Sequence, residues 1–333
     1  MKMIVFFNNK GGVGKTSLVY HLAWMYADNG IRVLAADLDP QANLTSMFLD
    51  EDKLEDLWPD GKHPKSILGV IEPILKGTGD IAEPHIEEID DNIGLLIGDL
   101  GLSNFEDKLS DAWPRCHDGD EAAFRVISAF YRILYDAALK RNVDLVLIDV
   151  GPNLGAINRA ALIASHYVTI PLAPDLFSLQ GLRNLGPTLL KWRKEWAERL
   201  KKNPDRTLNL PTGDMNPLGY IILQHAMRMD RPVKAYNRWM KRIPSVYREA
   251  VLNEPDTDSS IPPDKDPYCI YQLKHYRSLM PMAMEARKPM FFLKPADGAI
   301  GAHQKAVLDC YEDFKNLAGQ IAAQSKIDFP PKQ

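Results

Sequence analysis

Short apolar runs rich in β-branched residues alternate along the chain with longer stretches in which apolar residues lie three and four positions apart. A short run without alternation is typical of a strand buried on both faces of a parallel sheet. The longer pattern predicts amphipathic helices. The predicted strands are 2–7, 31–36, 93–97, 144–149, 167–171 and 218–223. The predicted helices are 16–29, 121–140, 153–165, 176–202 and 300–323.

The alternation of strands and helices determines the expected fold class. A strand, a helix and a second strand in that order form a βαβ unit, whose two strands pair in parallel. We therefore expect an α/β fold with a doubly wound, mostly parallel sheet flanked by helices. The chain shows no internal repeat and no clean domain boundary, so we predict a single domain over residues 1–325 and a flexible tail over 326–333.

Two charged regions interrupt this regular pattern. Residues 49–92 hold 13 Asp and Glu against four Lys, with proline and glycine breaks, and predict an irregular acidic insert of short helices and loops. Residues 225–248 hold seven Lys and Arg against one Asp, and an acidic, proline-rich loop follows at 254–266. We treat 225–267 as a divergent charged region within the single domain.

The overall composition is that of a globular protein, with 45% apolar and 25% charged residues. A net charge of −4 gives no general attraction to nucleic acid or anionic membrane, so such binding requires a local patch. Cys116, Cys269 and Cys310 lack ligand spacing, which favours a reducing compartment without a metal cluster. No apolar run approaches ~20 residues and no secretory leader is recognisable, so we expect a cytoplasmic protein without a membrane span.

A glycine-rich segment, KGGVGKTS, joins the first predicted strand to the first predicted helix, which is the context that a phosphate-binding loop requires. Its glycines let backbone N–H groups point at phosphate oxygens, and the helix N-terminus adds its positive end. We expect Lys15 to bridge the β- and γ-phosphates of ATP and the Thr16 hydroxyl to bind Mg²⁺. The alternative is a glycine-rich turn without a ligand. The predicted ATP-binding residues here are Lys10, Gly11, Gly12, Val13, Gly14, Lys15, Thr16 and Ser17.

Aspartates stand at the ends of two predicted strands, Asp37 and Asp39 after 31–36 and Asp149 at the end of 144–149. Ligands of open α/β sheets bind at the carboxyl ends of the strands. Residues two apart on a strand point the same way, so Asp37 and Asp39 could both face the phosphates. One could orient an attacking water and the other a magnesium-bound water, with Asp149 supporting Mg²⁺. The alternative is that all three are structural carboxylates at strand ends.

Four segments in this order resemble the ParA/MinD family of deviant-Walker ATPases, most closely the short ParA-type partition ATPases that lack an N-terminal helix-turn-helix. A weaker likeness resumes at EARKPMFF, residues 285–292, and in the last helix. The resemblance implies the P-loop NTPase fold and hydrolysis of ATP to ADP and phosphate. The four segments are KGGVGKTS at 10–17, DLDPQAN at 37–43, LIDVGP at 147–152 and IPLAPDLFSLQGL at 170–182.

The resemblance also implies roles for single residues. The lysine matching Lys10 reaches across an ATP-bound homodimer to the phosphates of the partner, and the aspartate matching Asp39 activates the hydrolytic water. A ParB-like or other activating protein then stimulates slow hydrolysis. The catalytic residues expected on this basis are Lys10, Lys15 and Asp39. The expected Mg²⁺ site is Thr16, Asp37 and Asp149, and Pro174 and Asp175 join the ATP-binding residues.

The chain departs from the family pattern most over residues 183–285, which include the basic and aromatic segment 225–248. If this segment is helical, its basic residues fall largely on one face, which suits contact with the DNA backbone without base reading. The alternative is a solvated helix face balanced by the acidic loop at 254–266. The candidate DNA contacts are Arg228, Arg231, Lys234, Arg238, Lys241 and Arg242.

Three functions compete at this point. The first is an ATP-switched homodimer that binds DNA non-specifically and partitions or positions cargo in the bacterial cytosol, at the nucleoid. The second is a regulatory or signalling ATPase that controls a partner effector protein. The third, a metabolic ligase or kinase, is disfavoured because a second lysine in the loop signals a partner subunit at the phosphates. A membrane-targeting C-terminal helix is disfavoured because its polar face lacks a basic cluster.

Overall fold

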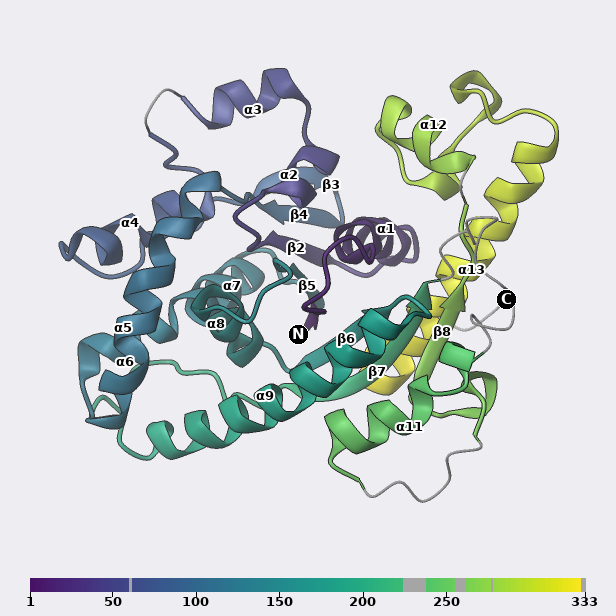
Figure 1. Cartoon of the computed structure of the whole chain (residues 1–333). Helices are drawn as coiled ribbons and strands as arrows, with labels where there is room; N and C mark the ends of the chain where they lie inside the picture. Colours follow the sequence, from purple (N-terminus) through teal and green to yellow (C-terminus); the bar gives the residue numbers. More distant parts are fainter. Residues whose placement is uncertain (60–61, 224–237, 255–260, 277, 331–333) are drawn as a thin grey trace.

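The computed structural model of the chain describes residues 1–59, 62–223, 238–254, 261–276 and 278–330. Eight strands of this part form one sheet in the order β3-β4-β2-β5-β1-β6-β7-β8 (Figure 1). Neighbouring strands run parallel, except that β3 and β4 are antiparallel. The predicted α/β fold is therefore confirmed. The strands are β1 Lys2–Phe6, β2 Val33–Asp37, β3 Glu87–Asp90, β4 Ile93–Leu96, β5 Leu145–Asp149, β6 Tyr167–Leu172, β7 Asn216–Leu223 and β8 Cys269–Leu273.

Helices connect and cover these strands. The α-helices are α1 Lys15–Asp28, α2 Asn43–Phe48, α3 Glu51–Leu57, α4 Ile67–Lys76, α5 Phe105–His117, α6 Glu121–Ile127, α7 Ala129–Lys140, α8 Ala156–Ala164, α9 Leu176–Leu200, α11 Ile243–Tyr247, α12 Leu279–Ala286 and α13 Ala302–Ser325. The short 3₁₀ turns are η1 Leu100–Asn104, η3 Pro263–Lys265, η4 Met290–Phe292 and η5 Pro295–Asp297, and η2 Arg248–Leu252 is a π-helical turn.

Both faces of the sheet are buried, which explains why its strands are apolar without alternation. Met3 and Val5 of β1 belong to a core built with α5, α7, α8 and α9. Ile4 and Phe6 of the same strand belong to a second core built with α1 and α13. Successive residues of a strand point to opposite faces, so one short apolar run contributes to both cores.

Several elements differ from the expectation. The helix predicted over 121–140 breaks at Ser128 into α6 and α7. The helix α5 was not predicted, although its buried residues have helical spacing, because Pro114 interrupts the pattern. The strand β8 was missed because only Ile270 and Leu273 of its five residues are buried, which gives neither an apolar run nor a regular alternation. The buried side chains of α5 are Phe105, Leu109, Ala112, Trp113 and Cys116.

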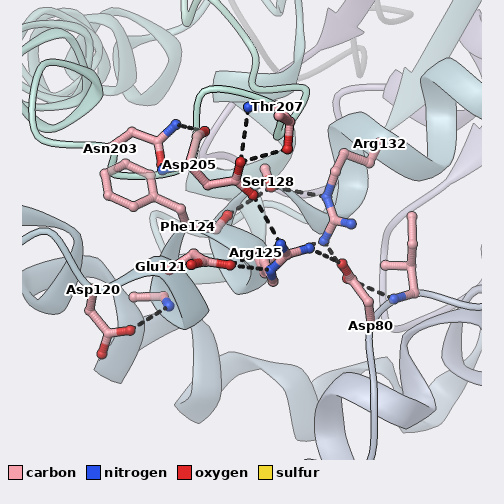
Figure 2. A network of polar contacts seen from close by, with 12 residues as sticks. Asp80, Asp120, Glu121, Phe124, Arg125, Ser128, Arg132, Asn203, Asp205 and Thr207 are labelled. Atoms are coloured by element: carbon pink, nitrogen blue, oxygen red, sulfur yellow. Dashed lines mark hydrogen bonds and ion pairs between the residues drawn. The ribbon is translucent and has the colours of Figure 1, made fainter.

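The acidic insert contains the helices α3 and α4, where short helices and loops were expected, and also the edge strand β3, which was not predicted. Asp80, between α4 and β3, accepts hydrogen bonds from Arg125 of α6 at 2.8 Å and Arg132 of α7 at 2.7 Å (Figure 2). Arg125 also pairs with Glu121 and with Asp205, which follows α9 (Figure 2). This ion-pair network, defined by Asp80, Glu121, Arg125, Arg132 and Asp205, fastens the insert to two other parts of the chain.

The C-terminal part closes one face of the molecule. The helix α13 packs against α1, and the Tyr26 hydroxyl of α1 donates to the Ala318 carbonyl at 2.9 Å. Beyond α13, Phe329 of the segment predicted as a tail lies edge-on against the Tyr26 ring, with the centroids 5.6 Å apart. Among the described residues, no helix combines the length and the apolar character needed to cross a bilayer.

Candidate functional site

The glycine-rich segment forms the turn between β1 and α1 at the carboxyl edge of the sheet (Figure 1). Gly12 and Gly14 have φ angles of 70° and 83°, a region that other residues rarely adopt. The helix α1 begins at Lys15, and no side chain caps its N-terminus. No acidic residue occupies its first turn. The free N–H groups and the positive end of the helix macrodipole therefore remain available for an anion.

Lys15 points into the edge of the sheet and is only 7% exposed. Its ammonium group donates to the Asn8 carbonyl at 3.3 Å, a long hydrogen bond that satisfies little of the charge. Burial lowers the pKa of Lys15, while the Asp149 and Asp39 carboxylates act in the opposite direction. A buried cation with so weak a partner suits an incoming phosphate group.

Asp37 is fully buried at the end of β2 and is held by Thr45 of α2. The Thr45 backbone N–H and hydroxyl both donate to its carboxylate at 2.8 Å. The Gly98 N–H donates to the same hydroxyl at 2.8 Å, and a Cβ at Gly98 would lie 2.8 Å from the Asp37 carboxyl group. Burial raises the pKa of Asp37 to about 6, although the hydrogen bonds from Thr45 act to lower it. Thr45 and Gly98 thus fix the orientation of Asp37.

Asp149 ends β5 beside β1 and β2, and it is fully buried. Neither of its carboxylate oxygens makes a hydrogen bond of normal geometry with the described residues. Burial raises the pKa of Asp149 well above its usual range, and the Asp37 carboxyl group adds to this, while the Thr16 hydroxyl acts the other way. Such an unsatisfied carboxylate is costly unless a cation or water binds it.

The donor set fits Mg²⁺ bound together with a nucleotide. Among the described residues, no three His, Cys, Asp or Glu side chains are spaced to hold a metal ion by themselves. Mg²⁺ commonly takes one or two protein oxygens and completes its shell with phosphate oxygens and water. The orphaned Asp149 carboxylate, with Thr16 near it, meets that requirement.

The loop after β5 lies against the other parts of the site. A Cβ at Gly151 would be 3.2 Å from the Asp39 carboxylate, and one at Gly11 would be 3.7 Å from Pro152. The Asn158 amide donates to the Gly151 carbonyl at 2.8 Å and so holds the loop from α8. The loop therefore lies next to both Asp39 and the glycine-rich turn.

Glu106 of α5 fixes the far end of this loop. Its two carboxylate oxygens accept from the backbone N–H groups of Ala156 and Ile157, at 2.5 Å and 2.9 Å, at the start of α8. The carboxylate also meets the positive end of the α8 dipole. Glu106, Thr45 and Asn158 are site residues that the sequence did not single out, because their partners are distant along the chain. For Glu106, the helical spacing of α5 was the available signal.

Lys10 lies at the entrance of the site and pairs with Asp175, the N-cap of α9, at 2.5 Å. Its side chain is 30% exposed, and its ammonium group lies 5.8 Å from the centroid of the Phe177 ring, a side chain that is itself 69% exposed. Asp175 also accepts from the Ser178 N–H at 2.8 Å. The structure thus places Lys10 away from the glycines that follow it, on a carboxylate of its own chain.

A cavity of about 150 Å³ opens beside Gly14 and Ser17. Its walls come from α1, the ends of β7 and β8, α12, η4 and α13, with Leu18, Tyr276 and Met290 among the side chains. An apolar cavity next to the glycine-rich turn has the character expected for the flat ring of a nucleotide base.

The predicted site residues fall into two groups. The structure brings the glycine-rich turn, Lys15, Asp37, Asp39 and Asp149 together at one edge of the sheet, with Lys10 and Asp175 at the rim. Pro174 directly precedes Asp175 at the start of α9. Of the candidate DNA contacts, Arg238, Lys241 and Arg242 lie apart from this edge, directly before α11. Arg228, Arg231 and Lys234 lie outside the described residues.

The described basic residues near α11 are exposed and gather around one aromatic ring. The guanidinium groups of Arg238 and Arg242 lie 4.3 Å and 5.4 Å from the centroid of Trp239. Lys241 is exposed beside them. The helix α11 lies along α9 (Figure 1), whose second half carries further exposed lysines, Lys191 and Lys194.

Comparison with known proteins gives consistent matches. A family model described as an AAA domain matches residues 1–202. Protein IncC of Escherichia coli is 30% identical over 203 residues, which cover 60% of this chain and 48% of IncC. The sporulation initiation inhibitor protein Soj of Bacillus subtilis is 29% identical over 184 residues, which cover 55% of this chain and 63% of Soj. The matches thus span about half to two thirds of these relatives.

A solved structure matches nearly the whole chain. It is that of a putative plasmid partition protein from Borrelia burgdorferi bound to AMPPNP, and it covers 97% of this chain and 98% of its own. The sequences are 21% identical and the TM-score is 0.58. This likeness supports the fold, in which the glycine-rich turn lies between β1 and α1.

Proposed function

Because the chain belongs to the ParA/MinD family of P-loop ATPases, we propose that it is an ATP-dependent dimerisation switch that hydrolyses ATP to ADP and phosphate. One observation carries the proposal. The carboxyl edge of the sheet holds an uncapped helix N-terminus, a buried lysine with a weak partner and an orphaned buried carboxylate, Asp149. An anion and a cation bound together, as in ATP with Mg²⁺, would satisfy all three.

The residues of this edge divide the chemistry between them. The backbone of the glycine-rich turn and Lys15 would hold the phosphates and stabilise the charge that develops on the transferred group. Thr16 and Asp149, with Asp37 held by Thr45, would hold Mg²⁺, which neutralises phosphate charge when bound. Asp39 would orient the attacking water, because its carboxylate is only 7% exposed and lies against Gly151.

The proposal of a homodimer is based on the position of Lys10. In the described state this lysine is bound to Asp175 of its own chain, at the rim of the site. Its partial exposure, and the exposed Phe177 and Leu176 next to Asp175, suit a surface that a second copy covers when ATP is bound. Lys10 would then exchange Asp175 for the phosphates of the facing copy.

The proposed role of the switch is partition or positioning of cargo on DNA, in the bacterial cytosol. The exposed Arg238, Lys241 and Arg242 support non-specific contact with the DNA backbone. A ParB-like or other activating protein would trigger hydrolysis and release. The alternative is a regulatory switch acting on an effector protein, which the name of the Bacillus relative and the ordered acidic insert favour.

Dimerisation tests the central proposal. Light scattering after size-exclusion chromatography should give a dimer with Mg²⁺ and a non-hydrolysable ATP analogue, and a monomer with ADP. Lys10→Ala should remain monomeric, whereas Lys305→Ala, an exposed lysine of α13, should dimerise normally. A monomer of the unmodified chain under all conditions would refute the switch.

DNA binding separates the two roles. Retardation of duplex DNA in a gel at low salt should appear with the ATP analogue and weaken in Lys241→Glu but not in Lys305→Glu. Absence of retardation at low salt would remove the DNA role and favour the regulatory alternative.

A further inference from the structure

A second concave surface lies beside the second half of α1. It is a groove of about 540 Å³ between α1 and the segment from α12 to η5. Trp24 of α1 and Phe291, Phe292 and Leu293 provide its apolar lining. Arg287, Lys288 and Lys294 provide its charged lining. The proposed ATPase mechanism does not use any of these residues.

The aromatic side chains of this groove form a continuous wall. The Trp24 and Phe292 ring centroids lie 6.1 Å apart, and Phe292 packs against Phe291 at 4.9 Å. On the other side, Trp24 lies 6.4 Å from Phe48 at the end of α2. Phe291 is buried in the core and supports Phe292, while Trp24 and Phe292 are partly exposed. A partly exposed apolar wall suits an aromatic or aliphatic anchor side chain.

Only part of the positive charge in the groove is neutralised by the chain itself. Lys288 pairs with Asp297 at 2.8 Å. Arg287 uses one guanidinium nitrogen to donate to the Leu49 carbonyl, at 3.0 Å, and it makes no ion pair with the part of the chain that the structure describes. Lys294 is exposed, and its side chain makes no ion pair with the described residues. The groove therefore combines an apolar wall with three cations, Arg287, Lys288 and Lys294, against one nearby carboxylate, Asp297, which interacts with both lysines.

The groove is connected to the phosphate-binding turn through one buried histidine. His21 of α1 bonds to the Ser17 carbonyl at 2.7 Å through Nδ1 and accepts from the Met290 N–H at 3.1 Å through Nε2. The two contacts define the neutral form with the proton on Nδ1. Met290 begins η4, whose next two residues line the groove. Ser17 lies in the first turn of α1. A ligand bound in the groove and a nucleotide bound at the turn would therefore both contact elements joined to the same helix.

Neighbouring elements also expose large apolar side chains. Met284 of α12, Ile300 before α13 and Leu308 of α13 are between 64% and 70% exposed. The helices α12 and α13 both pack against η4, next to the groove. Several exposed apolar residues in one region indicate a surface that another protein covers.

We infer that this groove is a docking site for an acidic peptide segment of a partner protein, with one aromatic or aliphatic anchor against the wall of Trp24 and Phe292. The charge pattern favours a peptide over a nucleic acid. Three cations near one carboxylate leave a surplus of two positive charges, which suits two carboxylates of a short peptide, whereas a phosphate backbone needs a longer basic track. Docking itself is independent of the proposed ATPase function, and its effect on nucleotide binding through α1 rests on that function.

Selection from a random peptide library displayed on phage tests the inference, with the full chain as bait and no nucleotide present. The enriched peptides should carry Asp or Glu on both sides of a Trp, Phe, Leu or Ile. A fluorescein-labelled copy of the most enriched peptide is then titrated with the chain by fluorescence polarisation. A labelled duplex DNA of similar length serves as the second probe.

Two variants and a matched control make the binding test specific. Lys294→Glu reverses one cation of the groove and should weaken the peptide about tenfold or more. Phe292→Ala removes part of the wall and should weaken it similarly, with circular dichroism verifying the fold. Lys194→Glu makes the same charge change on α9, on the opposite face of the sheet, and should leave binding unchanged.

Three outcomes would overturn the inference. They are enrichment of peptides without acidic residues, peptide binding that Lys294→Glu leaves unchanged, and duplex DNA that displaces the peptide and depends on Lys294 in the same way. Since no nucleotide is present, these outcomes are independent of the dimerisation experiment. Loss of ATP-driven dimerisation with intact peptide binding would refute the proposed function alone.

Discussion

Two polar clusters of the molecule differ in how their charges are paired. In the ion-pair network, each acidic and basic side chain has a partner of opposite charge, and Arg132 also donates to Ser128 and to the Arg125 carbonyl (Figure 2). At the carboxyl edge of the sheet, Asp149 has no hydrogen-bond partner of normal geometry among the described residues, and Lys15 has one long contact.

The difference separates a structural cluster from a binding site. A network whose members neutralise each other joins segments of the chain and needs no further ligand. Buried charges that lack a close partner reduce the stability of the fold. They are retained where a ligand pairs with them. The contrast predicts that substitutions in the ion-pair network affect folding, whereas those at the sheet edge affect nucleotide binding and turnover.

Lys15→Ala should give the largest effect on turnover. It removes the cation expected at the β- and γ-phosphates, and loss of one such stabilising group lowers turnover by about 10²-fold or more. The free energy of unfolding should change little, because the desolvation cost of the buried ammonium group is removed together with its attraction to Asp149 and Asp39. ATP turnover and urea denaturation measure the two effects. A destabilised Lys15→Ala chain with normal turnover would show that Lys15 is structural and would contradict the assignment of the sheet edge as a binding site.

Asp149→Asn should weaken the Mg²⁺-dependent binding of ATP about 10- to 100-fold, since a carboxylate facing the metal is replaced by a neutral amide. Titration of a fluorescent ATP analogue with and without Mg²⁺ measures this change. Binding without Mg²⁺ should change little, which serves as the internal control. An equal loss in both conditions would show that Asp149 is structural.

Arg132→Ala should show the reverse behaviour. Arg132 is 8% exposed, and its loss leaves Asp80 without one of its two arginine partners, so the free energy of unfolding should fall by about 2 kcal/mol. ATP affinity should be unchanged. Arg115→Ala removes an exposed arginine that pairs with Asp111 and Asp120 and should cost less than about 1 kcal/mol, which makes it the matched control. Urea denaturation compares the two.

The two clusters should also respond to pH in opposite directions. The folded-state pKa of Asp149 is raised, so without nucleotide and Mg²⁺ the folded chain binds more protons than the unfolded chain above pH ~4, and stability falls as the pH rises. Asp149→Asn should therefore raise the melting temperature more at pH 8 than at pH 5.

The pKa of Asp80 is lowered by Arg132 and Arg125 against its burial, so its stabilising contribution is present above pH ~4 and is lost as the pH falls further. Asp80→Asn should accordingly lower the melting temperature at pH 7 and have less effect near pH 3. Thermal melts of both variants against pH measure the contrast. Parallel profiles would mean that the clusters do not differ in this respect.

Asp175→Asn should give the smallest effect. Asparagine retains the N-cap of α9 but weakens the pair with Lys10, whose side chain is 30% exposed. Lys10 should then be released more easily, and half-maximal dimerisation should need a few-fold less ATP analogue. Light scattering against analogue concentration measures the shift. A higher requirement would mean that Asp175 assists rather than restrains dimerisation.

The sequence was sufficient for the β–α alternation and for the glycine-rich turn because both depend on residues that are neighbours in the chain. Short apolar runs marked the strands from β1 to β7 with the exception of β3, and the turn between β1 and α1 followed from its position. Helix ends were less certain. The break at Ser128 depends on tertiary packing of α6 and α7, which local pattern does not show.

The sequence by itself therefore determined the fold class and the residue types of the candidate site. Only the tertiary structure decided which charges are satisfied. That Asp149 is orphaned, that Thr45 holds Asp37 and that Glu106 holds the start of α8 all depend on contacts between segments far apart in the chain. The same holds for Arg125 and Asp80, which look like ordinary surface charges in sequence. Burial and pairing are properties of the packed sheet and helices, and they separate a binding site from a structural network.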